Sequence, residues 1–481
     1  MGKFIGRKPE LKVLRDLLRK NTSSFVVIKG RRRIGKSRLI KEFTRNHQTI
    51  LITGFPPSKK TTALSQKEEF KRQLLKQARL HEPSIDSWAN LFMALGEATK
   101  QGRYVIVLDE ISWLGSKDPD FLGHLKTAWD LYFSPNPELI LVVCGSVSSW
   151  INRNILSSTG FVGRISVRMD IKELPVHDCA QFWNDQIGRI DPYEIFKALC
   201  VTGGIPRYLE EIITTDSAEE NIQKLCFSPS GLLFNEFDSV FNDIFSEKSA
   251  ICREILKHLA EGSLLLTDIY KTLGVTPNSY YIHCVDELEQ AGFVSRDYTW
   301  NIKTGKVSNL SRIRLSDNYV RFYLKLILPK KKQIEKSSYS AKNTVFTDSF
   351  RSMLGLQFEN LVLNNFGAIC KNLNLPLSDI QMVGPYFQKP TARKKGCQID
   401  ILVQTYDQVL YLIEIKFSKK AIGEKVKQEV KEKISNLTIP RGFSIKPILI
   451  HVNGVSSNLY NDRFFSRILD FTDLITERRH L

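Results

Sequence analysis

The stretch that decides the fold is Gly30-Arg31-Arg32-Arg33-Ile34-Gly35-Lys36-Ser37. An apolar run, Phe25 to Lys29, precedes it, and a segment with Leu39, Ile40 and Phe43 on one helical face follows it. The eight residues fit the pattern GxxxxGK[ST], which requires a strand before it and a helix after it. Glycines let such a loop turn its backbone N–H groups, with the helix N-terminus, toward phosphate oxygens. The stretch therefore predicts a nucleotide-phosphate loop.

Two residues of this loop have specific predicted roles. Lys36 would reach the β- and γ-phosphates of ATP, and the Ser37 hydroxyl would bind Mg²⁺. The remaining predicted cofactor-binding residues here are Gly30, Arg31, Arg32, Arg33, Ile34, Gly35 and Arg38. For the three loop arginines, contact with the nucleotide and simple exposure to solvent both stay open.

A second apolar run, Tyr104 to Leu108, ends in an acidic pair, Asp109-Glu110. This is the composition of the Mg²⁺-binding strand that accompanies such a loop in enzymes that hydrolyse ATP. Asp109 would hold Mg²⁺ through its water shell, and Glu110 would orient or deprotonate the attacking water. The sequence therefore predicts an ATPase with ATP and Mg as cofactors.

Short apolar runs alternate with amphipathic stretches from the N-terminus to about residue 230, which predicts an α/β fold with a parallel sheet wrapped by helices. Strands are expected at residues 25–29, 49–53, 104–108 and 139–144. Residues 172–225 are expected to be helical, with breaks at Gly203, Gly204 and Pro206. We therefore predict an ATPase core over residues 1–170 and a helical lid over residues 171–245.

The pattern changes after residue 245. Helices are expected at residues 251–260, 266–273 and 278–291, and β-like runs at 293–298 and 311–315. Three helices and a hairpin predict a winged helix-turn-helix over residues 246–328, with a helical bundle and an incidental hairpin as the alternative. Its last helix would lie near duplex DNA and the wing lysines, Lys303 and Lys306, on phosphates. Acidic residues on that helix would repel phosphates, so the module could instead bind protein.

A lysine-rich segment, residues 329–347, is predicted to be a linker, and residues 348–481 a further α/β domain. In it, Asp400 lies on one expected strand, and Glu414 and Lys416 lie on the next. Residues two apart on a strand share a face, so Glu414 and Lys416 would point into one site. The two carboxylates would bind Mg²⁺, with Glu359 on a preceding helix as a further ligand. Lys416 would neutralise charge or position the nucleophile.

Several of these segments resemble known families. Phe4-Ile5-Gly6-Arg7, the phosphate loop, Leu108-Asp109-Glu110 and Gly203-Gly204-Ile205-Pro206 are similar to the archaeal-type ATPase branch of the STAND/AAA+ superfamily. The spacing from Asp400 to Lys416 resembles the PD-(D/E)XK nucleases, which implies a restriction-endonuclease-like domain. It also resembles the C-terminal domain of uncertain function that archaeal-type ATPases often carry.

The ATPase resemblance covers roughly residues 1–330 and implies further nucleotide contacts. Gly6 and Arg7 would lie by the adenine, and Pro206 would lie over the base. Ser146, after the strand at 139–144, would sense the γ-phosphate. Arg164 is the candidate arginine finger or phosphate sensor, because a guanidinium can neutralise charge on the γ-phosphate. A solvated surface arginine is the alternative for Arg164.

Composition limits the partners. The chain has 69 Lys and Arg against 51 Asp and Glu, a net charge of +18, which favours nucleic acid, DNA before RNA, with anionic membrane surfaces as the rival. No apolar run approaches the ~20 residues of a membrane span, and no secretory signal is evident, so we expect a cytoplasmic protein. The eight cysteines show no metal-binding spacing. A homo-oligomer stays open.

These observations predict an ATP-binding and ATP-hydrolysing protein that binds DNA and regulates a C-terminal, metal-dependent nuclease-like module, in defence or DNA processing. The alternative is a STAND-like signalling switch in which the C-terminal domain is a non-catalytic binding module.

Overall fold

The computed structural model describes residues 3–476 apart from 57, 59, 187, 246–248, 337–347, 391 and 393. The chain divides into two compact units, residues 1–172 and 173–481. The first unit has nearly the extent of the predicted ATPase core, while the finer division of the second stays a prediction. Residues 337–347 of the predicted linker lie outside the described residues.

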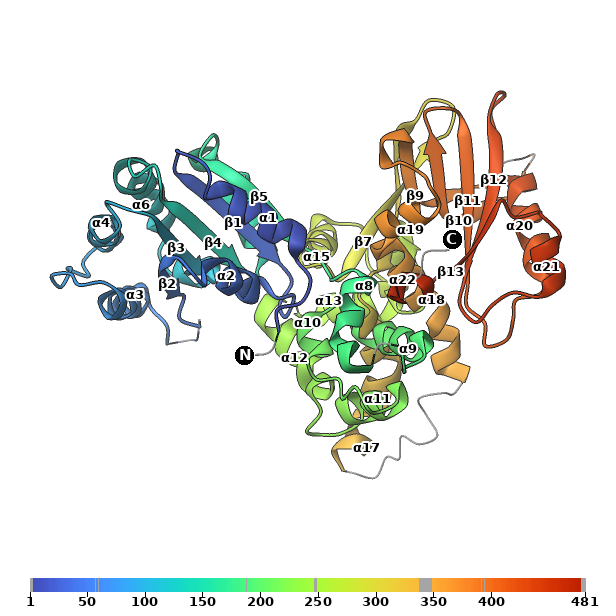
Figure 1. The fold of residues 1–481 in the computed structure, drawn as a ribbon, viewed down its shortest axis with the longest axis horizontal. Coiled ribbons are helices and arrows are strands. Elements are labelled where there is room, and N and C mark those ends of the chain that lie inside the picture. The colour runs from blue at the N-terminus through green and yellow to red at the C-terminus, as the bar shows by residue number, and fades with distance from the viewer. Residues whose placement is uncertain are drawn as a thin grey trace. The chain divides into compact units, whose positions relative to one another are not determined.

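The first unit contains a five-stranded parallel sheet (Figure 1). Its strands are β1 (Ser24–Gly30), β2 (Gln48–Thr53), β3 (Tyr104–Asp109), β4 (Ile140–Gly145) and β5 (Ile165–Ile171), in the order β2-β3-β4-β1-β5. Four of them are the expected strands. The edge strand β5 was not predicted, because its residues alternate between half-buried and exposed instead of forming an apolar run.

The helices from α3 onward bury a shared aromatic core against the sheet, and α1 and α2 do not contribute to that cluster. The helices of this unit are α1 (Lys8–Leu17), α2 (Lys36–Thr44), α3 (Ala63–Gln77), α4 (Trp88–Ala98), α5 (Ile111–Leu114), α6 (Phe121–Ala128) and α7 (Ser148–Ile151), with the shorter turns η1 (Trp129–Phe133), η2 (Asn152–Leu156) and η3 (Thr159–Phe161). Trp88 packs edge-on against Phe70 and Phe121, with ring centroids 5.5 and 4.8 Å apart. Each such buried ring stabilises the fold by roughly 1.5–3 kcal/mol.

The second unit begins with helices. They are α8 (Val176–Ala180), η4 (Gln181–Gln186), α9 (Pro192–Thr202), α10 (Pro206–Leu209), α11 (Ala218–Cys226) and α12 (Leu232–Phe245). The expected break is present, because Gly203 follows α9 with a φ of 58° and Pro206 starts α10. The region predicted as a lid is therefore helical, as expected.

Three helices and a small antiparallel sheet follow. The elements are α13 (Ser249–Leu259), β6 (Leu264–Leu265), α14 (Leu266–Leu273), α15 (Ser279–Gln290), β7 (Val294–Asn301) and β8 (Lys306–Leu315). The sheet order is β6-β8-β7. Next come α16 (Asn318–Phe322), η6 (Tyr323–Ile327), η7 (Leu328–Lys330) and α17 (Lys331–Glu335). Ile334 of α17 is buried, so this part of the predicted linker is packed and helical.

The C-terminal part is built around a mixed sheet of order β13-β12-β11-β10-β9. Its elements are α18 (Asp348–Asn364), α19 (Phe366–Asn372), η9 (Leu377–Asp379), β9 (Ile380–Gln388), β10 (Cys397–Thr405), β11 (Val409–Lys416), α20 (Lys425–Asn436), β12 (Ser444–His451), α21 (Ser457–Asn461), β13 (Arg467–Asp470) and α22 (Asp473–Thr476). Strands β9, β10 and β11 are antiparallel, and β11, β12 and β13 are parallel. The edge strand β9 was not predicted, because Gly384 and Pro385 interrupt its apolar pattern.

The β7–β8 hairpin shares a core with this sheet. Trp300 and Ile302 belong to the same buried cluster as residues of β9 to β12. The Trp300 indole N–H donates to Gln404 Oε1 at 2.8 Å, and Gln404 Nε2 donates to the Ile302 carbonyl at 2.9 Å. One face of the predicted wing is therefore covered by protein, while Lys303 and Lys306 at its tip are exposed.

Within the described ranges, no helix has both the length and the apolar character needed to cross a membrane.

Candidate functional sites

The phosphate loop leaves β1 through a position that only glycine fits. Gly30 has a φ of 150°, and a Cβ there would lie 2.6 Å from the Ile171 carbonyl oxygen on the neighbouring strand β5. At the other end, Gly35 has a φ of 93° and precedes the first residue of α2. These two glycines allow the loop to curl between strand and helix.

Lys36 is held inside this curl. It is buried, and its Nζ donates to the carbonyl oxygens of Gly30 at 2.8 Å and Arg31 at 3.0 Å. Burial lowers the pKa of Lys36, whereas the charges of Glu110 and Asp109 act in the opposite direction. The ammonium group therefore lies within the loop and close to the acidic pair that follows β3.

The two predicted Mg²⁺ ligands meet. Ser37 Oγ donates to Asp109 Oδ2 at 3.1 Å, although the two residues come from the segments after β1 and β3. The Cys144 thiol, on the intervening strand β4, lies 2.7 Å from Asp109 Oδ1 and donates to it. A hydroxyl and a carboxylate oxygen suit Mg²⁺, which binds proteins through few oxygen ligands and takes water and phosphate oxygens for the rest.

Glu110 and Ser146 form a second contact across the same strands. Glu110 has a φ of 49°, and its Oε2 accepts hydrogen bonds from Ser146 N at 3.1 Å and Ser146 Oγ at 3.0 Å. Burial raises the pKa of Glu110, while the Lys36 charge and the Ser146 hydrogen bonds oppose the shift. A raised pKa makes a carboxylate a better proton acceptor. The structure thus joins the predicted sensor to the predicted catalytic carboxylate.

Arg7 ties the N-terminal Gly6-Arg7 segment to the loop. Its guanidinium donates to the Ile34 carbonyl at 3.0 Å and the Lys172 carbonyl at 2.6 Å, and it pairs with Glu10 at 3.1 Å. Arg7 is buried and has a φ of 59°. Proximity of this segment to the adenine stays a prediction.

The other basic residues of the loop differ in environment. Arg31 is buried, and the Arg32 guanidinium lies over the Trp113 ring at 5.8 Å. Arg33 is exposed with a φ of 69°, and Arg38 is half-buried in the first turn of α2. Their predicted contacts with the nucleotide remain predictions.

Arg164 is engaged elsewhere in the first unit. Its Nε and one terminal nitrogen donate to the two carboxylate oxygens of Asp130 at 2.7 and 2.9 Å. These contacts do not connect Arg164 to Lys36 or Glu110, so the structure gives the predicted arginine finger a different partner. Pro206 belongs to the second unit and is the first residue of α10.

The second unit brings Asp400 and Glu414 together, as their strand positions predict. Strands β10 and β11 pair antiparallel, with Ile401 opposite Ile413. The backbone N–H of Ile415 donates to Asp400 Oδ2 at 2.8 Å, and Glu414 is completely buried. Two carboxylates from adjacent strands therefore face the same interior space.

Two lysines form ion pairs with these carboxylates. Lys433 Nζ lies 2.6 Å from Glu414 Oε2 and 3.6 Å from Asp400 Oδ1. Lys416 Nζ lies 3.1 Å from Glu414 Oε1 and 2.8 Å from Glu429 Oε2. The ammonium group of Lys433 thus bridges the carboxylate pair.

Lys433 and Glu429 on α20 were not predicted from the sequence. The missing signal is helical periodicity. Lys433 continues the stripe formed by the buried residues Val426 and Val430, at spacings of four and then three. A charged residue on the buried stripe of a helix indicates a partner inside the fold.

The surroundings of Asp400 and Glu359 disfavour the charged forms of both carboxylates. Burial raises the pKa of Asp400 to about 7, the Glu414 charge adds to the shift, and Lys433 opposes it. Burial also raises the pKa of Glu359, against the charges of Arg314 and Arg321. Buried carboxylates with raised pKa values gain most from a nearby cation.

Glu359 does not complete a ligand set. Within the described parts of the chain, no three His, Cys, Asp or Glu side chains lie close enough to hold one metal ion. The predicted trio of Glu359, Asp400 and Glu414 is therefore not assembled at metal-binding distances in this structure, and the joint set stays a prediction. Asp400 and Glu414 still suit a hard cation, because buried Glu414 Oε1 accepts no well-aligned hydrogen bond even from Lys416.

Comparisons with known proteins match the N-terminal and C-terminal parts of the chain to two different families. Residues 4–212 match a family described as an ATPase domain predominantly from Archaea, and residues 323–434 match a family of archaeal and bacterial proteins of unknown function. An uncharacterized protein of Methanocaldococcus jannaschii is 25% identical over 425 residues, which are 86% of this chain and 87% of that protein. A Walker-type ATPase of Pyrococcus abyssi has a similar fold, with a TM-score of 0.53, 17% identity, and coverage of 67% of this chain and 96% of that one.

These matches agree with the geometry of the first unit. The N-terminal part of the chain has the fold of a P-loop ATPase, and its residues 4–212 are similar to the archaeal ATPase domain, which implies ATP as the nucleotide. The comparisons support ATP hydrolysis and assign no activity to the C-terminal part.

Proposed function

We propose that this P-loop ATPase binds DNA and couples the ATP state of its first unit to a metal-dependent, nuclease-like site in its second. The observation that carries the proposal is the buried pair Asp400 and Glu414 on adjacent strands, with Lys416 beside it. A buried acidic pair with nearby lysines is costly to maintain without a ligand or a reaction to serve.

The ATPase half of the proposal assigns a role to each group of the first site. Lys36 stabilises negative charge on the β- and γ-phosphates. Ser37 and Asp109 hold Mg²⁺, which when bound neutralises phosphate charge. Glu110 Oε2 orients the attacking water and receives its proton, while Ser146 keeps the Glu110 side chain in place.

The nuclease half rests on the order of elements around the acidic pair. Two helices, three antiparallel strands, a helix and a parallel strand follow one another from α18 to β12. This order supports the restriction-endonuclease-like fold that the resemblance implies. Asp400 and Glu414 would hold Mg²⁺ or Mn²⁺, which when bound activates water and neutralises phosphate charge. Lys416, held by Glu429, would stabilise charge on the phosphate.

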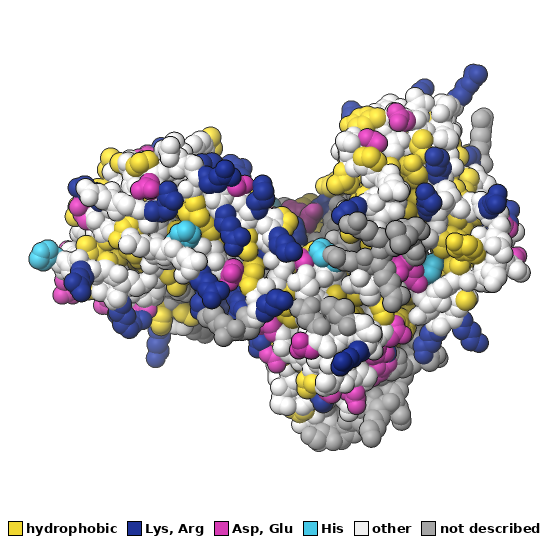
Figure 2. Space-filling view, in the orientation of Figure 1, with side chains coloured by type: hydrophobic (Ala, Val, Ile, Leu, Met, Phe, Trp, Pro, Cys, Tyr) yellow, Lys and Arg dark blue, Asp and Glu magenta, His cyan; other side chains and the backbone are white. Residues whose placement is uncertain are grey.

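DNA as the partner is supported by charge and by the small helical module. Lys and Arg side chains are spread over the visible face of both units (Figure 2), in keeping with the net charge of +18. The order of helices and strands from α13 to β8 supports a winged helix-turn-helix. On α15, Asp286 and Glu289 are both paired with Arg296, at 2.5 and 3.0 Å, which reduces their repulsion of phosphates.

A cleavage assay on single-stranded and duplex DNA and on RNA, with Mg²⁺ or Mn²⁺, tests the proposal. We expect Glu414→Gln to abolish cleavage and keep binding, whereas Lys419→Ala only weakens binding and lowers its salt dependence. Both variants must melt near the wild-type temperature. If wild type cleaves nothing with any metal while both variants lose binding in parallel, the nuclease half is wrong.

One observation favours the alternative function, a STAND-like signalling switch whose C-terminal domain only binds. Lys433 already neutralises Asp400 and Glu414, so the pair has a partner without any metal. Under this alternative, millimolar Mg²⁺ or Mn²⁺ leaves the melting temperature of the wild type unchanged. Under the main proposal, either metal raises it, because it binds only the folded pair.

A further inference from the structure

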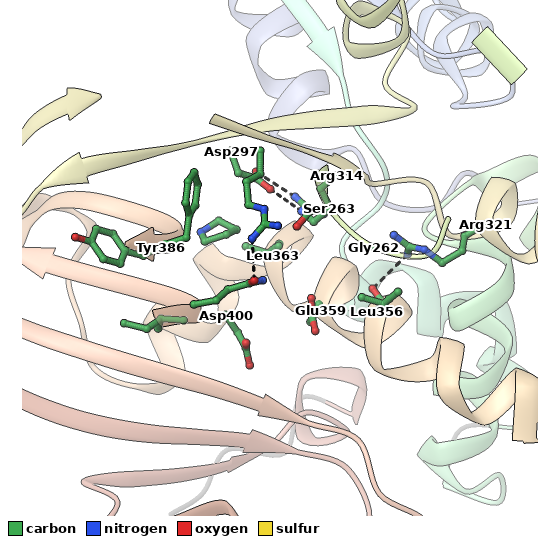
Figure 3. A pocket seen from close by; sticks show the side chains of 15 residues that line it. Gly262, Ser263, Asp297, Arg314, Arg321, Leu356, Glu359, Leu363, Tyr386 and Asp400 are labelled. Carbon is green, nitrogen blue, oxygen red and sulfur yellow. Dashed lines mark hydrogen bonds and ion pairs between the residues drawn. The ribbon is translucent and has the colours of Figure 1, made fainter. Parts of the chain in front are cut away.

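A cavity of about 250 Å³ lies beside the acidic pair in the second unit (Figure 3). Three arginines, Arg312, Arg314 and Arg321, line it together with Glu359 and Asp400. The arginines come from β8 and α16, outside the segment that carries the carboxylates. The C-terminal sheet and the preceding hairpin module therefore build this cavity jointly.

Arg321 is a buried cation whose hydrogen bonds, within the described part of the chain, all go to neutral oxygens. Its side chain is 1% exposed. Its terminal nitrogens donate to neutral oxygens, the Leu315 carbonyl at 2.6 Å, Gln357 Oε1 at 2.7 Å and the Leu356 carbonyl at 3.4 Å. Its Nε has no hydrogen-bond acceptor. Burial, together with the nearby Arg314 charge, lowers the pKa of Arg321 to about 9, while the charges of Glu359 and Glu261 act in the opposite direction.

Arg312 is in a similar position nearer the opening. It donates to Gln398 Oε1 at 3.1 Å and lies over the Phe387 ring at 5.6 Å, and its buried Nε also has no acceptor. Arg314 differs, because Asp297 accepts its Nε–H at 2.8 Å and compensates its charge (Figure 3). Two of the three arginines in the cavity lining therefore each keep a buried Nε–H without an acceptor.

We propose that this cavity is a binding site for a phosphate group of a nucleic-acid strand, with Arg312 and Arg321 as its donors. The inference deepens the proposed function and rests on it for the choice of nucleic acid. It assigns the phosphate contact to residues of β8 and α16, which neither family match nor the acidic motif indicates.

The chemistry favours a phosphate over other anions. A planar guanidinium presents a fork of N–H donors that matches two phosphate oxygens. Asp400 and Glu359 in the cavity wall would repel a plain anion, and they suit a phosphate that arrives with a divalent cation. The volume is below the roughly 300–1,000 Å³ of pockets that enclose a whole drug-sized ligand, so one phosphate and part of its nucleotide fit better than a complete cofactor.

The test measures binding of a fluorescein-labelled single-stranded DNA oligonucleotide to the full chain with Ca²⁺ in place of Mg²⁺, by fluorescence anisotropy at several salt concentrations. Arg312→Gln is compared with Arg467→Gln, which makes the same charge change at an exposed position of β13, on the opposite edge of the sheet from β9. We expect Arg312→Gln to weaken binding about tenfold or more, as for loss of a charge-assisted hydrogen bond, and Arg467→Gln less than twofold.

A second variant protects the test against misfolding. Arg321→Lys keeps the charge but loses the fork, and should also weaken binding. If it does not fold, Arg312→Gln alone decides, provided that its melting temperature matches that of Arg467→Gln. Equal affinities for Arg312→Gln and Arg467→Gln would overturn the proposal. So would a cavity that takes only free phosphate, seen if inorganic phosphate raises the melting temperature of wild type and not of Arg312→Gln while oligonucleotide affinities stay equal.

A cleavage assay on the same samples separates this inference from the proposed nuclease. If wild type does not cleave but Arg312→Gln loses oligonucleotide binding, the phosphate site stands and the nuclease fails. If wild type cleaves and Arg312→Gln both binds and cleaves like Arg467→Gln, the nuclease stands and the phosphate site fails.

Discussion

The nucleotide site of the first unit and the site of Asp400, Glu414 and Lys433 in the second unit use similar chemical groups. The two sites are assembled from the chain in different ways. In the first, Lys36, Ser37 and Asp109 all belong to two short motifs at the ends of parallel strands, and they contact one another or their own loop. In the second, the motif residues Asp400 and Glu414 meet a lysine from a helix that the motif does not include. A sequence motif therefore predicts all residues of a site only when no side chain from outside the motif takes part in that site.

The largest effect is expected from a variant that removes the proton acceptor of the nucleotide site. Glu110→Gln removes the proton acceptor and keeps the shape, so ATP turnover should fall about 10²–10⁴-fold while ATP affinity changes little. Phosphate release under saturating Mg²⁺-ATP and titration calorimetry measure the two quantities. Glu42→Gln on α2 is the matched control, with turnover near wild type. Normal turnover in Glu110→Gln would remove Glu110 as the catalytic residue.

The next effect tests whether Lys36 serves the nucleotide or only the loop. Lys36→Ala removes the buried cation held by the Gly30 and Arg31 carbonyls, and should weaken ATP binding by about 2–5 kcal/mol. The exposed Lys41→Ala on the same helix is the control. Titration calorimetry with Mg²⁺-ATP reports both variants. If Lys36→Ala binds ATP as tightly as Lys41→Ala, the loop does not hold phosphate through this residue.

The third prediction concerns the helix-borne lysine of the second site. Lys433→Ala leaves Asp400 without its cationic partner and Glu414 with Lys416 alone, so in EDTA the unfolding free energy should fall by about 2–4 kcal/mol, less than for a fully buried pair because Lys433 is 24% exposed. Asp400→Asn added to Lys433→Ala should recover part of the loss. The exposed Lys425→Ala on α20 is the control. Urea unfolding of all variants provides the measurement.

The same variant sharpens the choice between the two functions of this site. With Lys433 removed, Mg²⁺ or Mn²⁺ should stabilise the protein more than it stabilises wild type, because the metal no longer competes with an ammonium group. An unchanged melting temperature with either metal would mean that Asp400 and Glu414 serve Lys433 alone.

The smallest effect concerns Arg164 and its partner. The Arg164 hydrogen bonds lower the pKa of Asp130 to about 2, below its unfolded value. The pair therefore contributes stability above the unfolded pKa of Asp, roughly 3.9, and loses it as the pH falls through about 2. Because both side chains are partly exposed, Asp130→Asn should cost only about 0.5–1 kcal/mol at pH 7.

Urea unfolding between pH 7 and pH 3 measures the difference between Asp130→Asn and wild type, with the exposed Asp120→Asn as control. The difference should shrink at the acidic end. A large loss of ATP turnover in Asp130→Asn would instead tie the Arg164 pair to the nucleotide site.

The sequence alone determined the parts of this protein that depend on local pattern. The phosphate loop, four strands of the first sheet and the Asp109-Glu110 pair follow from runs of apolar residues and from glycine positions. Asp400 and Glu414 also meet as predicted, because strand periodicity decides which side chains share a face. Each of these features depends only on residues that are close in the sequence or that lie on the adjacent strand.

The tertiary structure alone decided which distant faces meet. It placed Lys433 beside the acidic pair and Glu359 in the same cavity as Asp400, and it turned Arg164 toward Asp130. It also covered one face of the β7–β8 hairpin with the C-terminal sheet and left Arg312 and Arg321 facing a cavity. None of these contacts follows from spacing, because each depends on how a helix or hairpin packs against an element far away in the chain, and packing is set by the burial of whole surfaces.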